Sequence, residues 1–178
     1  MIADYKKLYY DTLKPLVNSL DASRPYLLSS PSNGVETEKQ GGYSENPGDT
    51  AYGDIHFYTD FDNLWKDSTY KTPRCATEYG IQSYPLRDTM TAWINQSEWT
   101  YGSKSMNLRQ HHTGGAINNL VLVYQHFELP IACGVTKSSE LLTCEQFTNS
   151  AVYMDDFSLL SQVHQAVAMQ VESEHYRR

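Results

Sequence analysis

One carboxylate stands out for its setting. Glu78 lies in the run RCATEYG at residues 74–80, where a short and mostly uncharged stretch meets an acid, then an aromatic residue, then glycine. That order is typical of a buried strand that ends at the mouth of a barrel. Because the end of a strand is rigid, an acid placed there can be directed at one carbon atom. The chemistry that suits such an acid is attack on the anomeric carbon of a sugar, and Glu78 is the candidate nucleophile.

Polar side chains at two further strand ends are expected to lie near Glu78. His56 and Tyr58 end one expected strand, and Ser29, Ser30 and Asn33 follow another. In a parallel barrel these ends converge on one face, so Tyr58 could donate the hydrogen bond that keeps Glu78 ionised. Plainer alternatives stay open: Tyr58 as a core aromatic residue, and His56 as a residue that packs or bonds a backbone carbonyl. Retention of configuration needs a second carboxyl group roughly 5–5.5 Å from the first.

The elements that must position these residues alternate between strands and helices. Strands are expected at 26–30, at 54–58 and around Glu78, and a long loop is expected at 35–52. Helices are expected at 8–20, with an interruption at Pro15, around 64–65, and over 108–127. A last helix is expected to follow a capping box at 143–146, and its apolar stripe continues to residue 171. Such alternation predicts βα units and a parallel sheet. Three strands cannot close a barrel, so we expect the chain to be part of a larger fold.

Composition excludes several classes of partner. The 178 residues carry a net charge of −7, which argues against binding a nucleic-acid backbone, and they contain no apolar run of membrane-spanning length. Three cysteines make no disulfide framework: Cys75 is expected to be buried, and Cys133 and Cys144 either pair or stay free. Asn95 begins a glycosylation triplet.

No cofactor and no metal ion is expected. His111 and His112 are adjacent, so on a helix they point in different directions and cannot chelate one ion together. The sequence also lacks a His-x-x-x-His or Cys-x-x-Cys pair, and it lacks the Gly-x-Ser-x-Gly turn of a serine hydrolase.

Several segments together resemble one known family. The run Glu78-Tyr79-Gly80, followed by QSYP at 82–85, is similar to the nucleophile strand of the β-mannosidases of glycoside hydrolase family 2. Residues 23–34, 53–58, 109–115 and 174–178 are also similar to segments of those enzymes. The resemblance covers nearly the whole chain, and it is least distinctive at residues 129–146.

The resemblance implies an α/β fold, in which residues 1–178 form part of a TIM (β/α)8 barrel, about strands five to seven with their helices. The N-terminal half of the barrel and its last strand would be missing. It implies removal of terminal non-reducing β-D-mannose from oligosaccharides, in the lysosome, with the remaining domains of the parent enzyme as partners. Glu78 would be the nucleophile and Tyr58 its hydrogen-bonding neighbour. Asn33 and His56 would bind the substrate.

The chain departs from the family at one point. The acid/base glutamate of the family follows an asparagine on an earlier strand, and no Asn-Glu pair occupies that place here. We therefore expect the isolated chain to be inactive. The alternatives are a non-catalytic truncated product and a relative that acts on β-galactosides or β-glucuronides.

Overall fold

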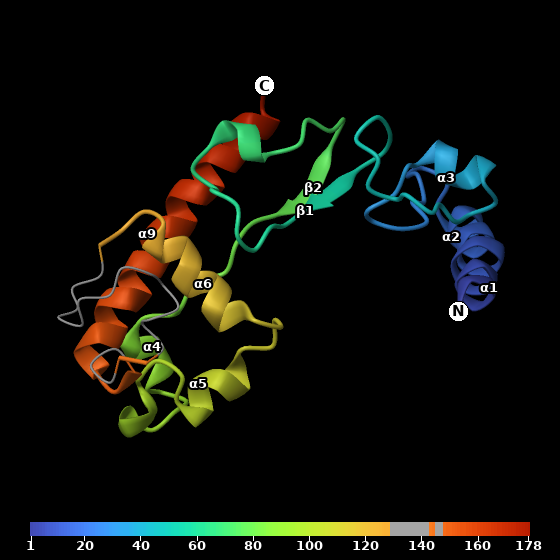
Figure 1. Ribbon diagram of the computed structural model, residues 1–178. Coiled ribbons are helices and arrows are strands. Elements are labelled where there is room, and N and C mark those ends of the chain that lie inside the picture. Colours follow the sequence, from blue (N-terminus) through green and yellow to red (C-terminus); the bar gives the residue numbers. More distant parts are fainter. Residues whose placement is uncertain (129–142, 145–147) are drawn as a thin grey trace. The chain divides into compact units, whose positions relative to one another are not determined.

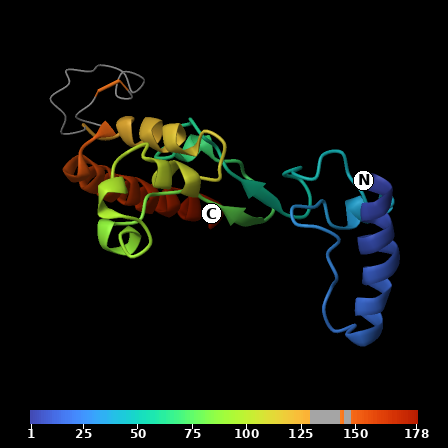
Figure 2. The same ribbon diagram turned by 90° about the horizontal axis from the view of Figure 1, so that it is seen from below.

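The computed structural model describes residues 1–128, 143–144 and 148–178, which form two compact units (Figures 1 and 2). Unit 1 contains Met1–Tyr58, Tyr70–Tyr79 and Ser173–Arg178, and unit 2 contains the described residues of Thr59–Thr69 and Gly80–Glu172. All the residues proposed for the site belong to unit 1.

The sheet of unit 1 consists of two parallel strands, which Figure 1 shows side by side. These are β1 (Ile55–Phe57) and β2 (Ala76–Tyr79). His56 pairs with Glu78 in their register, and the register shifts between Ile55 and His56. The prediction of parallel strands that carry His56 and Glu78 is therefore confirmed.

The expected strand at 26–30 is wrong. Within the described residues this part of the chain makes only an isolated antiparallel bridge, between Ser32 and Asp54. Pro25 and Pro31 flank the segment. Because proline has no N–H to donate, it interrupts the ladder of hydrogen bonds that a strand needs on either side.

The N-terminal helix of unit 1 changes its hydrogen-bonding pattern as it approaches Pro15. It begins as α1 (Ile2–Tyr5), continues as the π-helix η1 (Lys6–Leu13) and ends as α2 (Lys14–Leu20), with Pro15 in the first turn of α2. Because proline has no N–H to donate to the preceding turn, it interrupts the α pattern inside a helix, and the π pattern of η1 lies directly ahead of it. The expected loop at 35–52 begins with a short helix, α3 (Val35–Lys39).

Unit 2 consists of helices and short turns. The expected helix over 108–127 is two helices, α5 (Lys104–Arg109) and α6 (Gly115–Tyr124), separated at Gly114, whose φ of +74° suits glycine. The remaining elements are η2 (Asp67–Thr69), in place of the helix expected at 64–65, α4 (Arg87–Met90), η3 (Gln96–Glu98) and α9 (Ala151–Tyr176), whose last residues belong to unit 1.

The buried face of α9 differs from the expected apolar stripe. Met154 and Phe157 are buried as expected, but Val163 is 40% exposed. The buried positions farther along α9 are largely polar: Ser158, Ser161, His164, Ala168 and Glu172. Polar groups of this helix bond the backbone at 81–84, as when the Ser161 hydroxyl accepts from the Tyr84 N–H at 2.9 Å. Gln146 of the expected capping box and Phe147 lie outside the described residues, and α9 begins at Ala151.

Three aromatic side chains stack inside unit 2. The ring of Trp65 lies 4.0 Å from that of His126, and His126 lies 5.4 Å from His164, with interplanar angles of 9° and 22°. His164 is buried, and neither of its ring nitrogens has a hydrogen-bond partner in the described part of the chain. Burial lowers the pKa of both histidines, and that of His164 falls to about 4 with the help of nearby His126.

We expect acid to destabilise unit 2 through His164. The unfolded chain binds a proton here below its ordinary pKa of 6.5, whereas the folded chain stays neutral down to a pKa of about 4. The stabilising contribution is therefore complete above pH 6.5 and is lost as the pH falls toward 4, by up to about 1.4 kcal/mol per pH unit. Urea unfolding at pH 7 and pH 5 measures this loss. His164→Phe should flatten the dependence, and an equal loss in the variant would contradict the prediction.

Candidate functional site

Three residues of unit 1 that the sequence singled out lie together. The Tyr58 hydroxyl donates to Glu78 Oε2 at 3.3 Å, and His56 Nδ1 lies 3.5 Å from the same oxygen. His56 and Tyr58 are two residues apart, so an extended backbone turns them to one side, and the strand register places Glu78 beside His56. Local geometry alone therefore brings two polar groups to one carboxylate oxygen.

This site is open to solvent. The side chain of Glu78 is 57% exposed and that of His56 is 19% exposed. The expectation that Glu78 lies on a buried strand is therefore wrong for this chain, since both central residues of β2, Thr77 and Glu78, are exposed. Cys75, which was also expected to be buried, is an exposed free thiol.

A buried carboxylate behind the site was not anticipated. Asp54 is 6% exposed, and its Oδ2 accepts from the Ser30 hydroxyl at 2.6 Å and the Thr77 hydroxyl at 2.7 Å. Its Oδ1 accepts from the Ser32 N–H at 3.1 Å. Burial alone would raise the pKa of Asp54, but these hydrogen bonds and the nearby His56 outweigh it and lower that pKa. An acid directly ahead of the apolar strand residue Ile55 is the sequence signal that could have found it.

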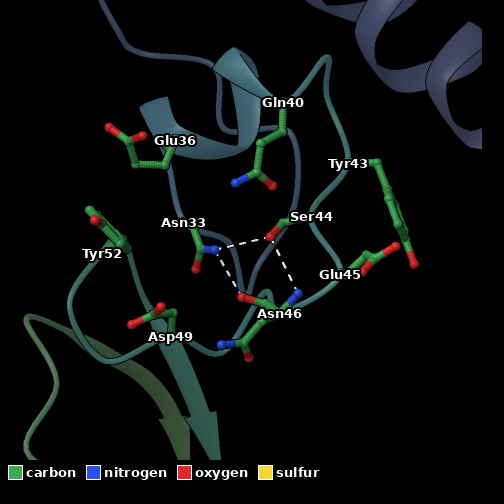
Figure 3. A pocket seen from close by; sticks show the side chains of 9 residues that line it. All are labelled: Asn33, Glu36, Gln40, Tyr43, Ser44, Glu45, Asn46, Asp49 and Tyr52. Atoms are coloured by element: carbon green, nitrogen blue, oxygen red, sulfur yellow. Dashed lines mark hydrogen bonds between the residues drawn. The ribbon is translucent and has the colours of Figure 1, made fainter.

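Asn33 lies apart from these contacts, in the wall of a hollow of about 510 Å³ (Figure 3). Its Nδ2 donates to Ser44 Oγ at 3.1 Å and to the Asn46 carbonyl at 2.8 Å. Its Oδ1 is buried without a hydrogen-bond partner in the described residues. The wall of the hollow comprises Asn33, Glu36, Gln40, Tyr43, Ser44, Glu45, Asn46, Asp49 and Tyr52. Asn33 thus holds the 44–46 loop in place, and its role toward a substrate stays a prediction.

Gly53 allows the backbone ahead of β1 to approach Ser32. Its φ is +48°, and a Cβ atom there would lie 1.8 Å from the Ser32 carbonyl oxygen. That oxygen accepts the Asp54 N–H at 2.9 Å, so the close approach maintains the bridge that places Asp54. A side chain at residue 53 must therefore displace either the bridge or the turn.

Gly53→Ala is expected to weaken the bridge by at least about 1 kcal/mol, because alanine combines the strained φ with a clash against backbone. Hydrogen–deuterium exchange of peptides that contain Asp54 reports the loss as faster exchange. Gly48→Ala is the matched control, since a Cβ there meets nothing within 4 Å. Equal exchange in the two variants would refute the proposed role of Gly53.

Neither a metal site nor a membrane-spanning helix is found in the described residues. No group of three or more His, Cys, Asp and Glu side chains there is placed to hold a metal ion. No helix in that part of the chain has the length and apolar character needed to cross a membrane. Cys144 is disulfide-bonded, and Cys133 lies outside the described residues.

Comparison with known proteins identifies relatives along the whole chain. It is 49% identical over 177 residues to a Caenorhabditis elegans protein named "Probable beta-mannosidase", and 37% identical over 177 residues to the "Beta-mannosidase" of Rattus norvegicus. Each match includes 99% of this chain, but only 19% and 18% of the relatives. The chain thus spans about a fifth of their length. No protein-family model matches it.

A solved structure has a similar fold. The crystal structure of β-D-mannosidase from Dictyoglomus thermophilum superposes with a TM-score of 0.68 at 23% sequence identity, over 97% of this chain and 18% of that one. At this identity the likeness concerns the fold alone, whereas the sequence matches establish common descent. Over 99% of its residues, the chain is therefore a homologue of the β-mannosidases.

Proposed function

We propose that this chain supplies the nucleophile of a retaining β-mannosidase of glycoside hydrolase family 2, which removes terminal non-reducing β-D-mannose from oligosaccharides. The observation that carries the proposal is the convergence of Tyr58 and His56 on one oxygen of Glu78. A nucleophilic carboxylate must stay ionised, and hydrogen-bond donors favour its ionised form. Homology to proteins named β-mannosidase supports the choice of sugar.

The proposed architecture is part of a (β/α)8 barrel. The parallel pair β1 and β2 is the pairing that such a barrel uses, and catalytic groups in these barrels lie at the C-terminal ends of strands. Tyr58 directly follows β1, and Glu78 is the third of the four residues of β2. The likeness to the fold of the Dictyoglomus enzyme supports this placement.

In this mechanism an oxygen of Glu78 attacks the anomeric carbon, and the leaving oxygen takes a proton from a second carboxyl group. Asp54 accepts a hydrogen bond from Thr77, the neighbour of Glu78, but it is buried and accepts three hydrogen bonds in all. It is therefore unsuited to donate a proton, and we place the acid in the part of the relatives' length that this chain does not span. The 178-residue chain by itself is expected to show no turnover.

A panel of aryl glycosides tests the proposal. The natural protein that carries this chain is expected to hydrolyse the β-mannoside faster than the matching β-galactoside and β-glucuronide, with β-mannose as the first product by NMR. Faster hydrolysis of the β-galactoside or of the β-glucuronide would assign the protein to that substrate instead. First release of α-mannose would contradict the retaining mechanism.

A non-catalytic role for the chain acting alone is the second candidate, and the unsuitability of Asp54 as an acid favours it. Mannoside turnover by the isolated chain would exclude this candidate. For the catalytic protein we propose a lysosomal location, consistent with the disulfide at Cys144, since disulfides persist outside the reducing cytosol. Co-localisation with a lysosomal marker tests that location.

A further inference from the structure

The hydroxyl groups of Ser30 and Thr77 form a hydrogen-bond network with Asp54, and the position of each hydroxyl proton follows from its partners. Asp54 Oδ2 accepts from Ser30 Oγ and from Thr77 Oγ1, and those two hydroxyl oxygens lie 3.2 Å apart. A hydroxyl has a single proton, and an ionised carboxylate is a stronger acceptor than another hydroxyl. Both protons therefore point at Asp54. As a result, Ser30 Oγ faces its other neighbours only as an acceptor.

The acceptor role of Ser30 Oγ fixes the proton on one nitrogen of His56. His56 Nε2 lies 2.9 Å from Ser30 Oγ, which has no proton left to give it. Nε2 must therefore carry the proton and donate. The tautomer of a histidine is set in this way by the hydrogen bond that one of its nitrogens makes.

The other nitrogen of the ring then has a defined role. His56 Nδ1 lies 3.5 Å from Glu78 Oε2, and with Nε2 already protonated it has either a bare lone pair or a second proton. A lone pair facing a carboxylate is repulsive, whereas a proton between the two atoms binds them. In the described residues, the titratable groups around His56 are Asp54 ahead of β1, Glu78 on β2 and Tyr58 after β1.

We propose that Asp54 and Ser30 are positioning residues that act through His56, holding its Nε2 proton so that Nδ1 bonds Glu78 Oε2 through a second proton. Tyr58 bonds the same Oε2, so both neighbours restrain one oxygen of the carboxylate. The geometry leaves Oε1 as the oxygen that attacks the sugar. This inference rests on the proposed function for its kinetic consequence only, because the position of the proton is a property of the free protein.

The test uses Ser30→Ala and Ser30→Thr in the natural protein that carries this chain. In wild-type protein labelled with 15N-histidine, the His56 resonances should report a protonated Nε2, with His56→Gln giving the assignment. Ser30→Ala should move the Nε2 signal toward the unprotonated position, and Ser30→Thr, which keeps the hydroxyl, should restore it. The same alanine variant should lower kcat about 3- to 10-fold with KM unchanged, and threonine should recover kcat.

Thr77→Val separates this route from a general disturbance of Asp54. Thr77 donates to the same carboxylate oxygen, whereas the acceptor for His56 Nε2 is Ser30 Oγ, so Nε2 should stay protonated in this variant. An unprotonated Nε2 in wild type, or unchanged resonances in Ser30→Ala, would overturn the inference. A rise of KM alone would also overturn it, by making Ser30 a substrate contact. Absence of mannoside turnover in wild type would instead refute the proposed function, and the resonances would still decide the position of the proton.

Discussion

Replacing Glu78 with glutamine is expected to lower kcat for an aryl β-mannoside by at least about three decades in the natural protein that carries this chain. Glutamine keeps the size of the side chain but is not a nucleophile, and it loses the charge that Tyr58 and His56 contact. Steady-state kinetics measures the change. In Glu78→Ala, which leaves room for an added anion, formate or azide should recover part of the turnover and give an α-configured product, because the anion replaces the missing nucleophile.

Asp11→Asn is the matched control for this prediction. It makes the same change from carboxylate to amide at an exposed position of the N-terminal helix of unit 1. Its kcat should stay within about twofold of wild type. If Glu78→Gln keeps more than a tenth of the wild-type activity, Glu78 is not the nucleophile.

The largest effect on stability is expected for Phe157→Ala. Phe157 is fully buried in α9 and contacts the rings of Tyr84, Tyr101 and Tyr153 at centroid distances of 5.5 to 6.1 Å. Removing a buried phenylalanine ring costs about 3–5 kcal/mol, since contacts are lost and a cavity remains. Hydrogen–deuterium exchange along α9 should show the loss as a matching fall in the free energy of local opening.

Val163→Ala on the same helix provides the comparison. Val163 belongs to the apolar stripe expected from the sequence but is 40% exposed, so its truncation should cost less than about 1 kcal/mol. A cost at Val163 as large as that at Phe157 would mean that the helix buries the whole apolar stripe predicted from the sequence.

The part of the site that could be predicted depends on local geometry. Strand periodicity places His56 and Tyr58 on one side, and parallel pairing places β2 next to β1, so their meeting with Glu78 follows from short-range rules. The parallel pair was predictable for the same reason: two apolar runs are separated by a connection that includes a helical turn. Family resemblance added the type of sugar, and the sequence comparison supports it.

The part that could not be predicted depends on contacts between distant segments. The expected strand at 26–30 has strand-like residues but pairs with no other strand in the described part of the chain, and a pairing partner cannot be identified from a single segment. Asp54 was overlooked because its importance comes from Ser30 and Thr77, which are 24 and 23 residues away. On α9 the apolar pattern did not predict that polar residues such as Ser161 are buried. Ser161 can be buried because its hydroxyl bonds the backbone at Tyr84, which is distant in the sequence.

In the proposed mechanism, the carboxylate of Glu78 forms a covalent bond to a mannosyl ring. Treating the natural protein with an activated 2-fluoro mannoside should trap that intermediate, because the fluorine slows both its formation and its hydrolysis, while the activated leaving group keeps its formation fast. Peptide mass spectrometry should then find the sugar on Glu78, in the segment 76–80. Finding the sugar on any other residue would show that Glu78 is not the nucleophile.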